Sequence, residues 1–467
     1  MLFQRPCNLS SNRYQLNQFF RNRSIVLVFL SLNFYFSGAQ QSLPSEIPIP
    51  DWARSGVIYE VNLRQYTPEG TFSAFRKHLP RLKEMGVDVL WLMPIFPISK
   101  EKRKGTLGSY YSISSYTEVN PEFGTKDEFK ILVKEIHRLG MKVILDWVPN
   151  HTGWDHNWIM EHPEWYLHDP VTDTIVHVEK TDWYDVADLD YNQKSMRISM
   201  IKAMLYWVDV LGVDGFRQDV AYLVPDQFWN QFLRTLISLK KELFLLAEAE
   251  VPEFRNASYF HADYAWTFKS LSWDIAAGIK NAKDFRVYHQ LDQEKFKKGC
   301  HMYFTSNHDE NSWNGTEFEK LGSAHQLFSA LTFTFDGIPL IYSGQEEPLR
   351  RRLRFFEKDT IGFRNYQYAS FYQKLAGIRK SHPVFWPDVP VIWSDNSNPG
   401  NVLSYTRKNN LEEALCIFNL SATEQEVSIQ NIPSKTSYKD LMTGKKMKIA
   451  SDKKIRLKPW EYIILIK

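Results

Sequence analysis

Residues 215–223 read GFRQDVAYL and place an arginine and an aspartate two positions apart at the end of a short apolar stretch. Alternate residues of a β-strand point to the same side. Arg217 and Asp219 should therefore project together from the carboxyl end of a strand at 213–219. A buried structural ion pair would account for two such charges. The alternative is a carboxylate that an arginine keeps ionised so that it can act as a nucleophile.

Short apolar runs of this kind recur along the chain, and helical patterns such as 72–86 and 126–140 fill most of the gaps between them. This alternation predicts βαβ units and a parallel sheet. Eight strands within roughly 330 residues favour a closed (β/α)8 TIM barrel over an open doubly wound sheet. No G-x-G-x-x-G motif follows the first strand, which argues against a dinucleotide-binding fold. The expected strands are 57–63, 87–95, 141–148, 213–219, 243–250, 261–266, 302–307 and 338–344.

Two segments depart from this rhythm. Residues 147–193, after the third strand, are polar and rich in His, Asp and Trp, which predicts a short functional subdomain inserted in the barrel. After about Phe385 the pattern changes to short alternating runs, which predicts a C-terminal antiparallel β-sandwich. We therefore expect a barrel at 52–384, with the subdomain inside it, and a β domain at 385–467.

The first 39 residues have the pattern of a secretory signal. Arg21 and Arg23 precede a mostly apolar run at 24–36, and the small residues Ser-Gly-Ala follow at 37–39. The run is shorter than the roughly 18–20 apolar residues that a membrane span needs. We therefore expect a protein exported to the periplasm or the medium, with no membrane span in its mature chain.

The mature chain would be nearly neutral. Removing residues 1–39 leaves 53 basic and 54 acidic residues, which gives no electrostatic case for nucleic acid or anionic membranes as partners. Cys300 and Cys416 remain, in segments assigned to different domains, so the fold does not depend on a disulfide framework. No Cys/His cluster has zinc spacing. The sequence leaves the oligomeric state open.

Four of the expected strands end in polar residues, where a TIM barrel carries its catalytic groups. Any one of these groups alone is more often structural than catalytic. Like charges that converge on one rim cost stability, however, so the set needs a functional reason. The four ends carry Asp146, Asn150 and His151 in LDWVPNH; Arg217 and Asp219; Glu248 and Glu250 in LLAEAE; and Asn307, His308, Asp309 and Glu310 in FTSNHDE.

The motifs LDWVPNH, GFRQDVA, LLAEAE and FTSNHDE resemble, in order, the four motifs of glycoside hydrolase family 13, the α-amylase family. The resemblance extends over about residues 52–467 and includes MPIFP at 93–97 and ADLDY at 187–191. Four motifs in this order are highly specific for the family and much less specific for the substrate.

The resemblance implies roles for the acids. Asp219 would be the nucleophile, and Arg217 beside it would keep it ionised. Glu248 would be the general acid/base, which must hold a proton near neutral pH. Glu250 would project the same way from a continuous strand, and the motif alignment favours Glu248. Asp309 would bind sugar hydroxyls and help to distort the ring.

The family positions also imply a binding set for the sugar ring under attack, with Tyr111 stacking on it and His151 and His308 as hydrogen-bonding partners. Two carboxyl groups about 5–5.5 Å apart would form and hydrolyse a covalent glycosyl-enzyme, so that the anomeric configuration is retained. The implied partner is an α-glucan or oligosaccharide, with no organic cofactor. The complete substrate-binding set is Tyr111, His151, Arg217, His308, Asn307 and Asp146.

Calcium is the metal that the resemblance implies, because Asn150 and Asp188 match calcium-ligand positions and calcium takes oxygen ligands. The histidine that many members carry four residues after the nucleophile is Leu223 here, preceded by Tyr222 rather than lysine. The calcium expectation therefore rests on two side chains.

The short subdomain suits α-1,4-glucan chains and favours an α-amylase-like endo-hydrolase. Val220, next to the nucleophile, resembles members that cleave α-1,6 bonds. This favours the alternative of an α-glucosidase, an oligo-1,6-glucosidase or a transglycosylase acting on short α-glucosides. A non-catalytic glucan-binding or scaffold protein is a more distant alternative. Such members usually lack one of the acids, and all three are present here.

Overall fold

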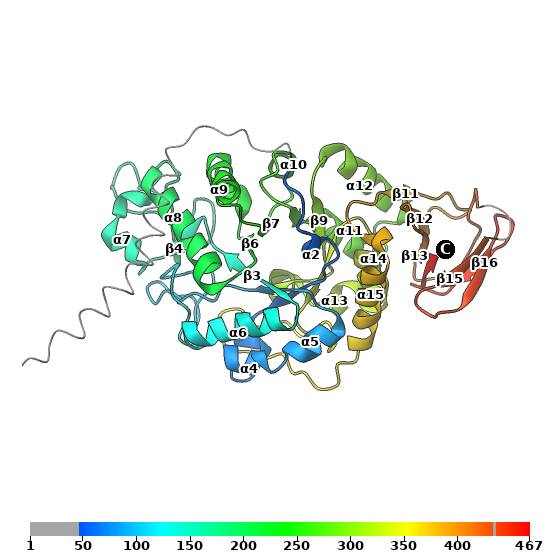
Figure 1. Ribbon diagram of the computed structural model, residues 1–467, viewed down its shortest axis with the longest axis horizontal. Helices are drawn as coiled ribbons and strands as arrows, with labels where there is room; N and C mark the ends of the chain where they lie inside the picture. The colour runs from blue at the N-terminus through cyan, green and yellow to red at the C-terminus, as the bar shows by residue number, and fades with distance from the viewer. Residues whose placement is uncertain (1–45, 433–435) are drawn as a thin grey trace, which may run out of the picture.

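Eight short parallel strands form a closed barrel in the centre of the larger, N-terminal part of the described structure (Figure 1). The computed structural model describes residues 46–432 and 436–467, so the segment interpreted as a secretory signal lies outside the described residues. Each barrel strand overlaps one predicted strand, and the predicted TIM barrel is confirmed. The strands are β1 (Ile58–Val61), β2 (Val89–Leu92), β3 (Lys142–Trp147), β6 (Gly215–Gln218), β7 (Phe244–Ala247), β8 (Ala262–Tyr264), β9 (Cys300–Tyr303) and β10 (Ile338–Tyr342).

Helices connect these strands and surround the barrel. In α6, for example, a capping box of Thr125 and Glu128 starts the helix, and Phe129, Leu132 and Ile136 form its buried face. Within the described residues, no helix has the length and apolarity that a membrane span requires. The helices are α2 (Asp51–Arg54), α3 (Leu63–Tyr66), α4 (Phe72–Arg76), α5 (Leu79–Met85), α6 (Lys126–Arg138), α7 (Asn157–Glu161), α8 (Lys194–Tyr206), α9 (Asp226–Ser238), α10 (Pro252–Asn256), α11 (Trp266–Ala276), α12 (Ala282–Lys295), α13 (Glu317–Leu321), α14 (His325–Thr334) and α15 (Ala369–Ser381).

The expected single helix at 72–86 is wrong. The structure has two helices there, α4 and α5, separated at Lys77 and His78. Pro80 lies in the first turn of α5, where its missing N–H is tolerated, whereas a proline inside a longer helix would break the hydrogen-bond ladder.

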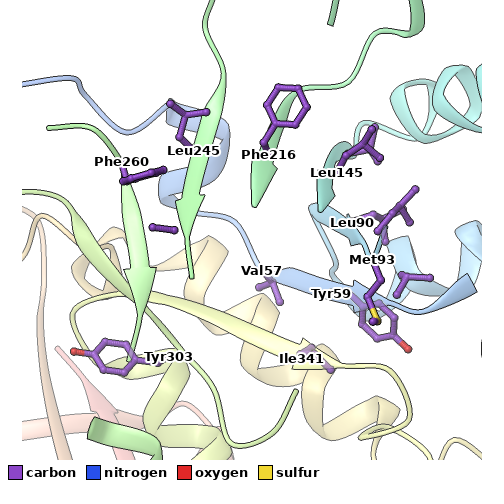
Figure 2. Packing of buried hydrophobic residues seen from close by; sticks show 14 of the residues in the cluster. Val57, Tyr59, Leu90, Met93, Leu145, Phe216, Leu245, Phe260, Tyr303 and Ile341 are labelled. Atoms are coloured by element: carbon purple, nitrogen blue, oxygen red, sulfur yellow. The ribbon is translucent and has the colours of Figure 1, made fainter. Parts of the chain in front are cut away.

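Successive residues of the barrel strands alternate between two separate apolar cores. Outward-facing side chains, among them Leu90, Leu145 and Phe216, pack with the surrounding helices (Figure 2). The inward-facing neighbours, such as Val89 and Ile144, fill the barrel interior. Inward positions near the carboxyl ends of the strands therefore point toward the rim where the polar motifs lie.

Gly215 allows β6 to lie close to β7 in this barrel. A Cβ atom added at Gly215 would lie 2.0 Å from the carbonyl oxygen of Phe244. This glycine is therefore part of the geometry that places Arg217, two residues along the same strand, on the inside of the barrel.

Residues 147–193 contain a small antiparallel pair, β4 (His151–Gly153) and β5 (Val186–Asp188), together with α7. His151 is paired with Asp188 in this sheet. The inserted segment is thereby joined directly to the motif that follows β3.

The C-terminal part forms an antiparallel β domain, as predicted, and lies beyond α14 and α15 in Figure 1. One face of its six-stranded sheet packs with the helices of the barrel, and the other face packs with the small β14–β17 sheet. Cys300 and Cys416 are both buried and free. The strands are β11 (Val391–Trp393), β12 (Val402–Lys408), β13 (Glu413–Asn419), β14 (Gln425–Val427), β15 (Thr436–Asp440), β16 (Lys446–Ile449), β17 (Ile455–Leu457) and β18 (Tyr462–Ile466).

The close approach at Gly215 gives a first prediction. We expect Gly215→Ala to destabilise the protein by at least about 3 kcal/mol or to prevent folding, because the added methyl group meets backbone atoms. The control is Gly377→Ala in α15, where no atom lies within 4 Å of the added Cβ. That change should stabilise the helix by up to about 1 kcal/mol. Urea unfolding of both variants measures the difference, and equal stabilities would contradict the prediction.

Candidate active site

One buried guanidinium joins the carboxylates of three neighbouring strands. The Nη1 atom of Arg217 lies 2.7 Å from Asp146 and 2.9 Å from Asp219, and its Nη2 atom lies 2.9 Å from Glu248. Arg217 has no exposed surface. The expectation that Arg217 and Asp219 project together is confirmed, and the partner set is larger than the sequence suggested.

The ionisation of Asp219 depends on how Arg217 is shared among the three carboxylates. Burial raises the pKa of Asp219 well above its usual value, and although Arg217 lowers it, Glu248 and Asp146 raise it further. One cation facing three carboxylates leaves an excess of negative charge, so the group favours retaining a proton. Arg217 acts on Asp219 in the predicted direction, and burial together with two further carboxylates opposes it. A set that holds both a protonated and an ionised carboxyl group is what double displacement requires.

Val220 positions Glu248 through its backbone. Its N–H group donates a hydrogen bond of 2.7 Å to Oε2 of Glu248. Its φ angle is 37°, in the left-handed region that β-branched residues rarely adopt. Strain of this kind persists where the surrounding structure holds it, often at functional sites.

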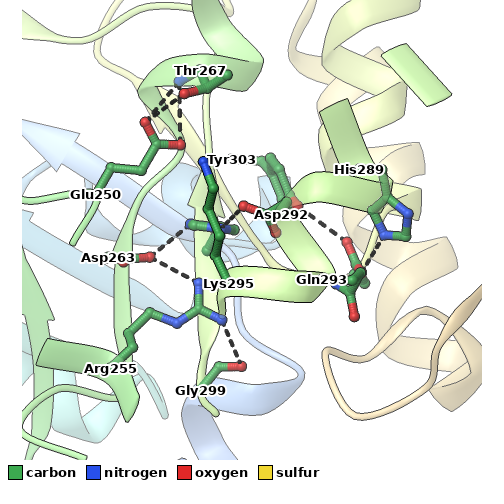
Figure 3. A network of polar contacts seen from close by, with 12 residues as sticks. Glu250, Arg255, Asp263, Thr267, His289, Asp292, Gln293, Lys295, Gly299 and Tyr303 are labelled. Carbon is green, nitrogen blue, oxygen red and sulfur yellow. Dashed lines mark hydrogen bonds and ion pairs between the residues drawn. The ribbon is translucent and has the colours of Figure 1, made fainter. Parts of the chain in front are cut away.

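Glu250 lies away from Glu248, contrary to the expectation from strand alternation. The strand β7 ends at Ala247, so the two-residue alternation no longer applies beyond it. Glu250 instead accepts hydrogen bonds from the backbone N–H and the hydroxyl of Thr267 at the start of α11 (Figure 3). The geometry therefore separates the two glutamates and leaves Glu248 at the site, as the motif alignment favoured.

The network around Glu250 is a set of ion pairs (Figure 3). His301 lies between Asp263, 2.7 Å from Nδ1, and Asp292, 2.9 Å from Nε2. Burial lowers the pKa of His301, but Asp263 and Asp292 outweigh it and raise the pKa to about 9. Glu250, Asp292 and His301 lie close enough to share a metal ion. Both nitrogens of His301 already face carboxylates, and we interpret the cluster as structural.

His308 is held by a second set of partners. Its Nδ1 atom contacts Glu60, and its Nε2 atom lies 2.7 Å from the hydroxyl of Tyr111 and 3.3 Å from Asp309. Burial lowers the pKa of His308, but Asp309 and Glu60 raise it to about 9. Glu60 was not among the predicted site residues, although a charged residue at an inward position of the apolar strand 57–63 was a signal for it.

Asp146 orients this part of the site from behind. It is fully buried and accepts hydrogen bonds from Arg217, from the hydroxyl of Tyr111 at 3.1 Å and from the indole of Trp91 at 3.2 Å. Asn307 is also buried, and its side-chain oxygen accepts a hydrogen bond from the backbone of Glu310. Both residues support the site without reaching its surface.

The acids open onto a cavity of about 460 Å³. Its lining includes five of the predicted site residues: Asp219, Glu248, Asp309, Tyr111 and His151. The other four predicted catalytic-rim residues, Arg217, Asp146, Asn307 and His308, are at most 2% exposed and are not among the lining residues. The predicted binding set thus divides into wall residues and supporting residues.

Aromatic side chains form much of the remaining wall. Trp183, Trp313, Phe355 and Phe356 come from the inserted subdomain, from the segment after β9 and from the segment after β10. Trp183 lies 5.6 Å from the ring of His151, whose pKa burial lowers to about 3, so that this histidine is neutral. No sequence pattern distinguishes these four residues from the many other aromatic residues of the chain.

The protein families that match this chain are consistent with the site described above. The family model described as "Alpha amylase, catalytic domain" matches residues 40–186 and 164–361, and "Maltogenic Amylase, C-terminal domain" matches residues 395–464. The chain belongs to glycoside hydrolase family 13, the α-amylase family. The resemblance seen in the four motifs is thereby confirmed.

Proteins that are similar over most of the chain have related names. The maltogenic α-amylase AmyB from Thermotoga neapolitana is 31% identical, with a TM-score of 0.81 over 89% of this chain and 99% of AmyB. An α-amylase from Lactobacillus plantarum is 30% identical, with a TM-score of 0.79 over 89% of this chain and 99% of that structure. The α-amylase MalA of Haloarcula japonica is 25% identical over 89% of this chain, which spans only 62% of MalA.

The two family positions for calcium lie together. The side-chain amide of Asn150 donates to Asp188 at 3.2 Å, and burial raises the pKa of Asp188 to about 6. Amide and carboxylate oxygens are suitable calcium ligands, so the residue types fit the ion. They supply one negative charge and a minority of the six to eight oxygens that calcium takes. Backbone carbonyls or water would have to provide the others.

The raised pKa of His301 predicts how the stability of the folded protein depends on pH. Its pKa is about 9 in the folded protein against about 6.5 ordinarily, so its contribution is complete below about pH 6.5 and is lost as the pH rises through 9. This difference corresponds to about 3 kcal/mol. We expect the thermal midpoint to fall over this interval, and to fall less in His301→Gln. Parallel losses in the two proteins, measured by differential scanning fluorimetry, would contradict the assignment.

Proposed function

We propose that this chain is a retaining glycoside hydrolase that cleaves α-1,4-glucosidic bonds of starch-like glucans or maltooligosaccharides by double displacement. The observation that carries the proposal is the placement of Asp219, Glu248 and Asp309 on the wall of one cavity, with Arg217 joining the first two from behind. The names of the similar α-amylases and maltogenic amylases support the α-1,4 bond.

In the first step, ionised Asp219 attacks the anomeric carbon while the proton of Glu248 passes to the glycosidic oxygen, and the leaving sugar departs. In the second step, Glu248 accepts a proton from water, whose oxygen attacks the same carbon and releases Asp219. Two displacements at one carbon retain its configuration. The negative charge that moves between Asp219 and Glu248 remains beside Arg217 throughout.

The supporting residues set the geometry of both steps. The N–H group of Val220 fixes the carboxyl group of Glu248, and Asp146 holds Arg217 and Tyr111 in place. Protonated His308 lies beside Asp309, where it can help to orient a carboxylate that binds sugar hydroxyls. Positioning of this kind lowers the barrier by preorganisation.

An α-glucosidase or transglycosylase on short α-glucosides is the alternative, because a sugar hydroxyl can replace water in the second step. Relatives named as maltosyltransferases match only 44–46% of this chain. A non-catalytic glucan-binding protein is disfavoured by the three acids on one wall.

We also propose that the chain is exported, on the pattern of residues 1–39. Sequencing the N-terminus of secreted protein would test the cleavage site.

The two glutamates of LLAEAE allow a matched test of the mechanism. We expect Glu248→Gln to lower kcat on soluble starch by at least about 10³-fold, because the amide cannot donate the proton. Glu250→Gln lies outside the cavity and should keep kcat within about threefold. Reducing-sugar release measures activity, and circular dichroism confirms folding. An active Glu248→Gln together with an inactive Glu250→Gln would overturn the assignment.

A calcium ion bound at Asn150 and Asp188 is our proposal for the metal. If it is correct, a chelator should lower the thermal midpoint of the wild-type protein, and added calcium should restore it. Asp188→Asn removes the one carboxylate of the site and should abolish both shifts. Differential scanning fluorimetry provides the readout without any activity measurement. A chelator effect of equal size in the variant would place the ion elsewhere.

A further inference from the structure

Residues 99–108, which we call the strap, lie between β2 and Tyr111 and join two walls of the cavity. We propose that the strap closes the cleft on the side of the sugar that is transferred to the enzyme, and that Lys104 fixes this closure. The consequence is release of short products from chain ends. The inference rests on the proposed glycoside hydrolase activity, and it specifies which part of the substrate the site accepts.

The first anchor of the strap is on the inserted subdomain. The amine of Lys104 lies 3.2 Å from the carboxylate of Asp185 and donates a hydrogen bond of 2.8 Å to the carbonyl oxygen of Asp182. It also lies 4.6 Å from the centre of the Tyr184 ring. The Lys104 side chain is only 14% exposed and that of Asp185 is 5% exposed, so solvent screens this ion pair little.

The second anchor is on the segment after β10. The backbone N–H of Thr106 donates to Glu357 at 3.1 Å, and that of Leu107 donates to the carbonyl oxygen of Phe356 at 3.0 Å. Gly105, with a φ angle of 61°, lies directly on Phe356, where an added Cβ would be 2.5 Å from the Cβ of Phe356. The strap therefore spans from the inserted subdomain to the opposite wall.

Both anchors belong to the cavity itself. Lys104, Asp182, Tyr184, Asp185 and Phe356 all line it, together with the catalytic acids. Its volume of about 460 Å³ is in the range of small-molecule sites. The strap and its anchors thus form part of the wall of the space in which the sugar lies.

The position of Glu248 shows on which side of the sugar the strap lies. Glu248 protonates the leaving group, so the leaving sugar lies on its side, next to Val220. The strap is connected instead to the Tyr111 side, because the Tyr111 ring is stacked at 6.2 Å on Phe355, which precedes Phe356. The strap therefore lies on the side of the sugar that becomes bound to Asp219, and closure there would leave room for few further units beyond that sugar.

Lys104→Met tests the closure, since it keeps the apolar stem and removes the charge. We expect early products from soluble starch to become longer, and the ratio of kcat/KM on starch to kcat/KM on maltotriose to rise about fivefold. Glu357→Ala removes the acceptor at the second anchor and should change both quantities in the same direction. Lys104→Arg keeps the charge and should restore the wild-type product profile. Anion-exchange chromatography of the products provides the readout.

The matched control is Lys102→Met. Lys102 belongs to the same strap and lies over the ring of Trp154, but it does not line the cavity. Its product profile should equal that of the wild type. Folded, active Lys104→Met and Glu357→Ala variants with wild-type profiles would overturn the inference, as would a wild-type enzyme whose first products are a long ladder. A wild-type protein with no activity on any α-glucan would instead refute the proposed function.

Discussion

The catalytic rim depends on the burial of Arg217 inside the barrel. A guanidinium without exposed surface must be paired, and its partners come from three adjacent strands. The register of the sheet makes this possible, because Asp146 and Arg217 are direct neighbours across β3 and β6. A shift of either strand by one residue would turn one of these charges into the outer apolar core. The ionic site and the strand register therefore constrain each other.

A second cation balances the opposite side of the rim. His308, with a pKa of about 9, lies between Glu60 on β1 and Asp309 beyond β9. Tyr111 connects the two groups, since its hydroxyl contacts both His308 and Asp146. The acids are thus held in one connected network, with Asp219 and Glu248 beside Arg217 and Asp309 beside His308.

Sequence patterns predicted the regular parts of this arrangement because they are local. Apolar runs located all eight barrel strands, and the acids at strand ends could be assigned to one rim. The predictions failed where the backbone leaves the strand geometry, as with Glu250, which turns away after β7 ends at Ala247. The aromatic wall was missed because Trp183, Trp313 and Phe355 meet only through long-range packing of separate loops.

Irregular backbone has its own role at this site. Barrel strands alone would direct alternate side chains into the interior, and a general acid must instead reach the substrate from the edge. The left-handed Val220 turns its N–H group toward Glu248 just beyond the end of β6, and Glu248 itself lies just beyond the end of β7. The regular strands carry the buried charges, and the first residues after the strands place the carboxyl groups of Asp219 and Glu248 in the cavity. Chemistry at this rim therefore depends on where each strand stops as much as on which residues it carries.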